Sequence, residues 1–225
     1  VYMGADISNH SYGCYCFNTD MESVIATAGD WGHLVVAAAG NESVNNDQDP
    51  NYPSSYPGNN VIAVAAVAED GQMATFSNVG ASSVDIAAPG VAILSTTPGD
   101  EYQSLNGTSM AAPHAAAVAA LLLSVEPGLS PSAIRQTLIN SARRNDLHSG
   151  STVSGGTLDA VAALQQYVNV PTTTAAPTTT QPPATTAAPT TTQPPATTAA
   201  PTTTQPPATT TQPPATTTQP PATTT

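Results

Sequence analysis

The C-terminal segment of this chain lacks the residues that a folded core requires. From Pro171 to Thr225 it contains only Pro, Thr, Ala and Gln, with no charged, aromatic or large aliphatic side chain. Such a segment cannot bury enough apolar surface to offset the entropy that is lost on ordering. We therefore expect one folded domain over residues 1–170, which is long enough for a hydrophobic core, and a disordered or mucin-like tail over residues 171–225.

The tail is repetitive. The unit TAAPTTTQPPAT occurs three times from Thr174, and a shorter TTQPPAT follows twice. Proline and β-branched threonine favour an extended, polyproline-like chain. Dense threonine beside proline is typical of an O-glycosylated stalk in a secreted protein, and an unmodified spacer is the alternative. A stalk of this kind would associate the protein with a cell wall or with glycans.

The charge of the chain excludes some partners. The formal net charge is −12, and the three basic residues are Arg135, Arg143 and Arg144. Nucleic acids and anionic membranes both need basic patches, so neither is expected to bind. The simplest interpretation of the acidic composition is solubility. The apolar run that follows His114 is too short to span a bilayer.

Hydrophobic patterning in the first half predicts alternating strands and helices. Two apolar runs rich in β-branched residues, 34–41 and 60–67, are typical of strands buried on both faces. Residues 84–90 and 91–97 are shorter strand candidates. A helix is expected within residues 19–33, capped by Thr19 or Asp20 and ending near Gly32. This alternation indicates an α/β domain with a mostly parallel sheet and flanking helices.

The second half is predicted to be helical. Residues 109–124 are apolar nearly all round, so we expect a central helix that is covered on every side. A second helix should start at the cap Ser130, with Pro131 at its first position, where the missing N–H is no loss. We expect a last, short amphipathic helix over residues 157–168.

The segment Gly107-Thr108-Ser109 places a hydroxyl at the start of the central helix. Gly107 lets the backbone turn tightly and lets a ligand approach closely. Ser109 then lies beside the unpaired N–H groups and the positive end of the helix dipole. Pro113 follows early enough for its missing donor to be tolerated. The segment therefore offers a nucleophile next to a site that stabilises an oxyanion.

Asn41 is a second candidate, because it ends the predicted strand 34–41. Ligands of parallel α/β sheets bind at the carboxyl ends of the strands, and an amide there can donate to an oxyanion. The alternative is a turn residue that tolerates a left-handed conformation after Gly40.

These motifs together resemble the subtilisin-like serine proteases of the subtilase, or peptidase S8, family. NGTSMAAPH resembles the nucleophile motif of the family, and VVAAAGNE resembles its oxyanion-asparagine segment. YPSSYPGNNVIAVAAV resembles the Tyr-Pro loop and the strand after it, and ADISNHSYG resembles the strand beside the specificity pocket. The resemblance covers nearly all of residues 5–168. It implies the C-terminal part of a catalytic domain.

The resemblance also implies a role for each matching residue. Ser109 would attack a peptide carbonyl, and the Asn41 side chain and the Ser109 N–H would hold the oxyanion. Met110 would lie against the nucleophile. The residues that would bind or line the substrate are Ser11, Tyr12, Gly13, Ala38, Ala39, Gly40, Gly107 and Thr108. The substrates would be proteins or peptides, and the family implies an extracellular, secreted location.

The aspartate and histidine motifs of the family do not occur in this sequence, although a serine nucleophile needs a general base. His114 matches a structural histidine of the family. His10, His33 and His148 have no evident carboxylate partner, so we interpret each as structural or solvated. We expect the catalytic aspartate and histidine upstream of residue 1. A noncatalytic subtilase-fold binding or cell-surface protein is the alternative.

The sequence leaves the metal and the disulfides open. No cofactor is required by the implied chemistry, and calcium is a candidate ligand of the acidic loop 45–53, which as a simpler alternative is a solvated loop. Cys14 and Cys16 are two residues apart, and neighbours at this spacing seldom form a good disulfide. We expect two thiols there, or a bond from one of them to a cysteine outside this chain. Two thiolates alone are too few for a metal site.

Overall fold

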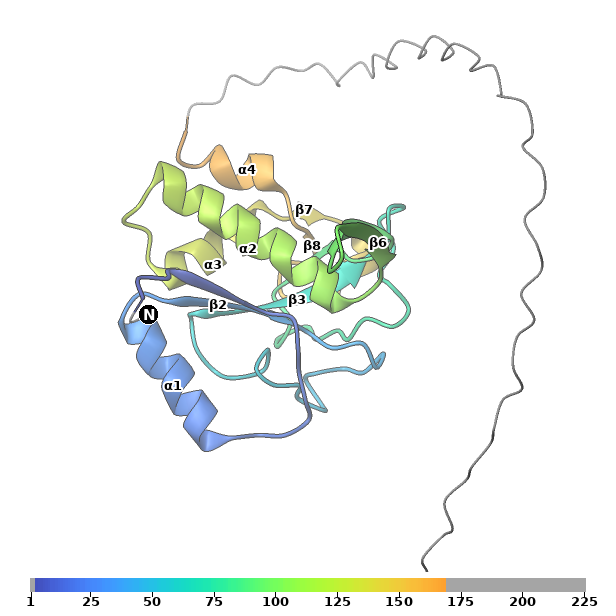
Figure 1. The fold of residues 1–225 in the computed structure, drawn as a ribbon, viewed down its shortest axis with the longest axis horizontal. Helices are drawn as coiled ribbons and strands as arrows, with labels where there is room; N and C mark the ends of the chain where they lie inside the picture. The colour runs from blue at the N-terminus through green and yellow to red at the C-terminus, as the bar shows by residue number, and fades with distance from the viewer. Residues whose placement is uncertain (1–2, 169–225) are drawn as a thin grey trace, which may run out of the picture. The chain divides into compact units, whose positions relative to one another are not determined.

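A parallel sheet forms the centre of the computed structural model, which describes residues 3–168 (Figure 1). The six-stranded sheet has the order β1-β2-β3-β4-β8-β7. Neighbouring strands are parallel except β7 and β8, which are antiparallel. The predicted α/β class with a mostly parallel sheet is confirmed. The strands span Ile7–His10 (β1), Leu34–Ala38 (β2), Val61–Val67 (β3), Ile86–Pro89 (β4), Arg143–Arg144 (β7) and Gly156–Thr157 (β8).

The two central strands are buried on both faces, as their continuous apolar runs predicted. Every residue of β2 and β3 is buried. Side chains alternate along β3, so Ile62 and Val64 join the large cluster under the helices, while Ala63 and Ala65 pack in a smaller cluster on the other face. Burial on both faces is what requires apolar residues at every position.

Helices cover both faces of the sheet (Figure 1). Ile25 of α1 packs with Val35 and Val61 on one face. On the opposite face, Leu122 of α2 and Leu138 of α3 belong to the large core cluster, together with Ala163 of α4. The helices span Thr19–Asp30 (α1), Thr108–Val125 (α2), Pro131–Ser141 (α3) and Ala160–Leu164 (α4), and a 3₁₀ turn spans Asp146–His148 (η1).

The helix α2 is only partly covered, which corrects the expectation that it is enclosed on every side. Ala111, Ala115 and Leu122 are fully buried, but Leu121 and Val125 are 47% and 39% exposed. Within residues 3–168, α2 is the one helix whose length and composition would let it cross a membrane. Its buried side packs against β1 to β4, so we assign it to the core.

Two of the predicted helix boundaries are corrected by the structure. The cap of α1 is Asn18, whose side chain accepts a hydrogen bond of 2.8 Å from the Met21 N–H, so neither Thr19 nor Asp20 caps it. Asp159 caps α4, which is shorter than the predicted segment 157–168 because Thr157 belongs to β8. The predicted cap of α3 is confirmed, since Ser130 Oγ accepts from the Ala133 N–H at 3.2 Å.

An antiparallel hairpin lies outside the main sheet. It consists of Ile93–Thr97 (β5) and Glu101–Leu105 (β6), with Ile93 paired to Leu105. The strand β6 was not predicted, because all five of its residues are exposed and no apolar face marks it. The predicted tail and its glycosylation lie outside the described residues.

Candidate active site

Ser109 is the second residue of α2, at the amino end of a helix whose buried side packs on the sheet. Gly107 is the N-cap, with a φ of 155° that favours glycine. Its N–H donates to the Gly90 carbonyl at 2.8 Å, which ties the helix start to the segment after β4. The Ser109 N–H is one of the first amides of the helix, which have no acceptor within the helix itself.

Asn41 lies against this helix start, three residues after the end of β2. Its Oδ1 accepts hydrogen bonds from the Thr108 N–H at 2.8 Å and from the Thr108 hydroxyl at 2.9 Å. Because the oxygen of the carboxamide is used in this way, its Nδ2 hydrogens remain as donors. A Cβ added to Gly107 would lie 3.6 Å from Nδ2. The structure thus brings Asn41 to the Gly107–Ser109 turn.

Ser11 contacts Ser109 from the end of β1. The Ser11 hydroxyl donates to the Ser109 carbonyl at 2.8 Å, and the Ser109 hydroxyl donates to the Ser11 carbonyl at 3.1 Å. Two segments that are far apart in the sequence are therefore joined by a reciprocal pair of hydrogen bonds. In this arrangement the Ser109 hydroxyl faces a carbonyl, which accepts its hydrogen bond but does not remove its proton.

Of the other predicted substrate-binding residues, Tyr12 directly follows Ser11 and is 54% exposed. The Gly40 N–H donates to the Thr108 hydroxyl at 3.2 Å. Gly13 has no room for a side chain, because a Cβ there would meet Asn51 Oδ1. Asn51 is almost fully buried, and sequence reasoning had not singled it out.

The two alanines of the predicted pocket are buried in this structure. Ala38 and Ala39 are only 3% and 0% exposed. The side chain of Ala39 packs in the cluster with Ala63 and Val67, on the face of the sheet opposite the large core cluster. The role of Ala38 and Ala39 in a substrate pocket stays a prediction.

Comparison with known proteins decides the family. A family model described as the subtilase family, Peptidase S8, matches residues 2–204. The chain belongs to the subtilase family. The predicted resemblance, which was based on the motifs around Ser109 and Asn41, is confirmed.

Individual subtilases show how far the similarity extends. Subtilisin DY of Bacillus licheniformis is 44% identical over 140 residues, which cover 62% of this chain and 50% of the relative. A thermophilic serine proteinase of Bacillus sp. (strain AK1) is 45% identical over 139 residues and is covered to 33%. Among solved structures, the Prenylagaramide maturation protease PagA has a TM-score of 0.66 and 30% identity, with 74% of this chain and 64% of that chain covered. This chain thus spans half or less of the length of these two curated relatives.

Two histidines of this subtilase chain take part in one hydrogen-bonded chain that ends at Tyr12. His33 Nδ1 donates to the Ala5 carbonyl at 2.8 Å, because a carbonyl only accepts. In a neutral ring Nε2 then accepts from the Ser8 hydroxyl at 2.8 Å. Ser8 Oγ accepts in turn from His10 Nε2 at 2.8 Å, and the Tyr12 hydroxyl donates to His10 Nδ1 at 2.7 Å. With this assignment, every hydrogen bond of the chain has one donor and one acceptor.

Stability should depend on the protonation of His10. Burial first, and the charge of His33 second, lower the pKa of His10 from its ordinary value of 6.5. The folded protein then binds fewer protons than the unfolded chain below that pH, so the free energy of unfolding should fall as the pH drops below about 6.5. Thermal unfolding of the intact protein, followed from about pH 7.5 to about pH 5, measures this. His10→Gln should flatten the profile, and an equally steep profile in that variant would contradict the assignment.

The remaining histidines have structural positions. His114 Nδ1 donates to the Met110 carbonyl one turn earlier in α2, at 2.9 Å. His148 is fully buried and donates from Nε2 to the Gly71 carbonyl at 2.9 Å. Within residues 3–168, no histidine is hydrogen-bonded to Ser109.

In the acidic loop 45–53, which is the candidate calcium site, the carboxylate of Asp47 is hydrogen-bonded to other residues of the protein. Asp47 accepts hydrogen bonds from the backbone and hydroxyl groups of Ser82 and Ser83, the shortest at 2.6 Å. Burial alone would raise the pKa of Asp47, but these hydrogen bonds hold it below its ordinary value. Among the described residues, no group of three or more His, Cys, Asp or Glu side chains could hold a metal ion. The Asp47 carboxylate is thus already occupied by serine donors.

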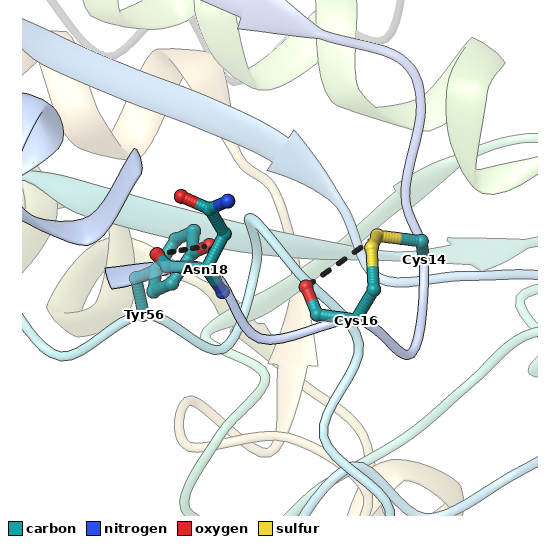
Figure 2. Close-up of a disulfide and its surroundings, with 4 residues drawn as sticks. All are labelled: Cys14, Cys16, Asn18 and Tyr56. Carbon is teal, nitrogen blue, oxygen red and sulfur yellow. Dashed lines mark hydrogen bonds between the residues drawn. A yellow bond between two sulfur atoms is a disulfide. The ribbon is translucent and has the colours of Figure 1, made fainter. Parts of the chain in front are cut away.

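Cys14 and Cys16 form a disulfide with each other, which corrects the expectation of two thiols or of an outside partner (Figure 2). Their Cα atoms are 5.2 Å apart, a separation that a disulfide can bridge. The backbone is therefore bent sharply at Tyr15. The spacing of the two cysteines predicted no bond between them, because the Cα atoms of residues i and i+2 lie further apart in an extended strand.

Proposed function

We propose that the intact protein is a serine endopeptidase that hydrolyses peptide bonds through an acyl-enzyme on Ser109. The observation that carries the proposal is the placement of Ser109 at the amino end of α2, beside the Asn41 carboxamide. Membership of the subtilase family supports it. The substrates are proteins or peptides, and the location is extracellular, with the tail acting as a stalk.

In the proposed reaction, the Ser109 hydroxyl loses its proton to a general base and its Oγ attacks the scissile carbonyl. The negative charge that develops on the carbonyl oxygen is stabilised by the Ser109 N–H and by Asn41 Nδ2. Collapse of the tetrahedral intermediate expels the amine, which takes up the proton, and water then hydrolyses the ester. The histidine that acts as the base and its aspartate partner lie upstream of residue 1. The segment Ser11–Gly13 binds the substrate backbone.

Covalent labelling tests the nucleophile directly. A fluorophosphonate probe reacts with activated serines, so we expect it to label the intact, processed protein at Ser109. Ser109→Ala should abolish the labelling. Ser124→Ala is the matched control, because Ser124 is an exposed serine of the same helix that bonds only to the Leu121 carbonyl. Peptide mapping of the labelled protein identifies the modified residue.

The alternative is a noncatalytic binding protein with the subtilase fold. The observation that favours it is the hydrogen bond from the Ser109 hydroxyl to the Ser11 carbonyl. In the described residues, the proton of Ser109 is therefore held by a carbonyl and not by a base. If the intact protein folds but is not labelled, the endopeptidase proposal is wrong and this alternative stands.

A further inference from the structure

The backbone on both sides of Tyr15 is held by a disulfide and by hydrogen bonds. Tyr15 lies between the two cysteines of the Cys14–Cys16 disulfide. Before it, Cys14 exchanges two backbone hydrogen bonds with Tyr52, of 2.9 and 2.8 Å. After it, the Tyr56 hydroxyl donates to the Asn18 carbonyl at 3.0 Å, and Figure 2 draws this hydrogen bond together with the disulfide. The position of Tyr15 is thus set by covalent and hydrogen-bonded constraints.

The Tyr15 hydroxyl is joined to Asn41 through one carboxylate oxygen. It donates to Glu42 Oε2 at 3.0 Å, and the same oxygen accepts the Asn41 backbone N–H at 2.7 Å. Burial raises the pKa of Tyr15, and Glu42 adds to the rise while a hydrogen bond from Asn78 opposes it. The phenol therefore keeps the proton that it donates to Glu42.

The turn that carries Asn41 is also hydrogen-bonded to the buried side chain of Asn78. Asn78 is fully buried, and its Oδ1 accepts the N–H groups of Glu42 at 2.9 Å and Val44 at 3.1 Å. Its Nδ2 lies 3.1 Å from the Tyr15 hydroxyl, to which it donates. Tyr15 and Asn78 thus hold the Glu42 segment from two directions, and the Asn41 side chain is left to bond Thr108.

We propose that Tyr15, presented by the Cys14–Cys16 disulfide, is a positioning residue that fixes the Asn41 turn through Glu42. The inference rests on the proposed function, in which Asn41 Nδ2 stabilises the oxyanion. Donors in an oxyanion hole are effective only when they are held in place before the charge develops. Because the oxyanion exists only in the transition state, loosening Asn41 lowers kcat and leaves KM nearly unchanged.

Tyr15→Phe tests this role in the intact protein, because it removes one oxygen and keeps the ring. From the usual strength of a hydrogen bond to a charged group, kcat for a peptide substrate should fall about tenfold. Tyr102→Phe is the matched control, since Tyr102 is 71% exposed on the hairpin strand β6, outside the contacts of Tyr15, Glu42 and Asn41, and it should leave kcat unchanged. The double variant Cys14→Ser/Cys16→Ser should also lower kcat, because it removes the disulfide that presents Tyr15.

A double-mutant cycle separates positioning from general structural damage. In an Asn41→Ala background, Tyr15→Phe should change kcat less than about twofold, because the donor that it positions is gone. An unchanged kcat in Tyr15→Phe alone, or an equal loss in both backgrounds, overturns the proposal.

A readout without catalysis distinguishes failure of this inference from failure of the proposed function. Hydrogen exchange of the Asn41 backbone amide, measured by NMR on the intact protein, should accelerate about tenfold in Tyr15→Phe as its acceptor Glu42 loosens. If the protein has no peptidase activity but the exchange accelerates, the contact is confirmed and the function is wrong. If the exchange rate is unchanged, the positioning role of Tyr15 is wrong whatever the activity.

Discussion

Asn41→Ala should lower kcat of the intact protein about 100- to 1000-fold, the loss already known from a subtilisin that lost its oxyanion asparagine. The physical reason is that Nδ2 donates to an oxygen that carries charge only in the transition state, so KM should change little. Steady-state kinetics on a peptide substrate measure the effect.

The control for this prediction is Asn140→Ala. Asn140 is an exposed asparagine of α3, a different helix from the one that carries Ser109. Its Oδ1 accepts a hydrogen bond from Gln136 Nε2. It should leave kcat unchanged. A loss of only a few fold in Asn41→Ala would show that the carboxamide serves the turn through its bonds to Thr108 and does not contact the oxyanion.

Arg135→Leu should lower the free energy of unfolding by about 3–5 kcal/mol, because it leaves a buried carboxylate without its partner. Arg135 Nη2 contacts Asp85 Oδ1 at 2.6 Å, and the Asp85 side chain is only 5% exposed. The second oxygen of Asp85 accepts the Ala63 N–H at 2.9 Å, so the charge lies inside the sheet. Denaturant unfolding of the intact protein measures the loss.

Two comparisons make the Arg135 prediction specific. Arg143→Leu removes a similar ion pair, Arg143–Asp159 at 3.2 Å, but the Arg143 side chain is 78% exposed, so the cost should be about 0–1 kcal/mol. Adding Asp85→Asn to Arg135→Leu should recover part of the stability, because the unpaired charge is removed. Equal losses from Arg135→Leu and Arg143→Leu would contradict the role of burial.

The same variant should acquire a pH dependence. Burial raises the pKa of Asp85 above its ordinary 3.8, while the charge of Arg135 and its hydrogen bond oppose the rise. Without Arg135 the pKa rises further, and the folded state then binds more protons than the unfolded chain. The stability lost in Arg135→Leu should therefore be largest near neutral pH and smaller as the pH falls toward the ordinary pKa of an aspartate.

Much of the fold followed from local pattern. The runs 34–41 and 60–67 predicted β2 and β3 because a strand buried on both faces must be apolar throughout. The strand β6 and the short pair β7 and β8 gave no such signal, since the residues of β6 and β7 are all exposed. The disulfide was missed because its formation depends on a backbone bend that no residue pattern marks.

The α/β class, the position of Ser109 at a helix start and the candidates for its neighbours could be predicted from the sequence, because apolar patterns and family motifs lie within single segments. Which of these side chains meet became clear from the packing of the folded chain. It joined Ser11 and Asn41 to the start of α2, and it connected Tyr15 to Asn41 through Glu42. These contacts link residues far apart in the chain, and their geometry depends on the packing of strands and helices, which no single segment contains.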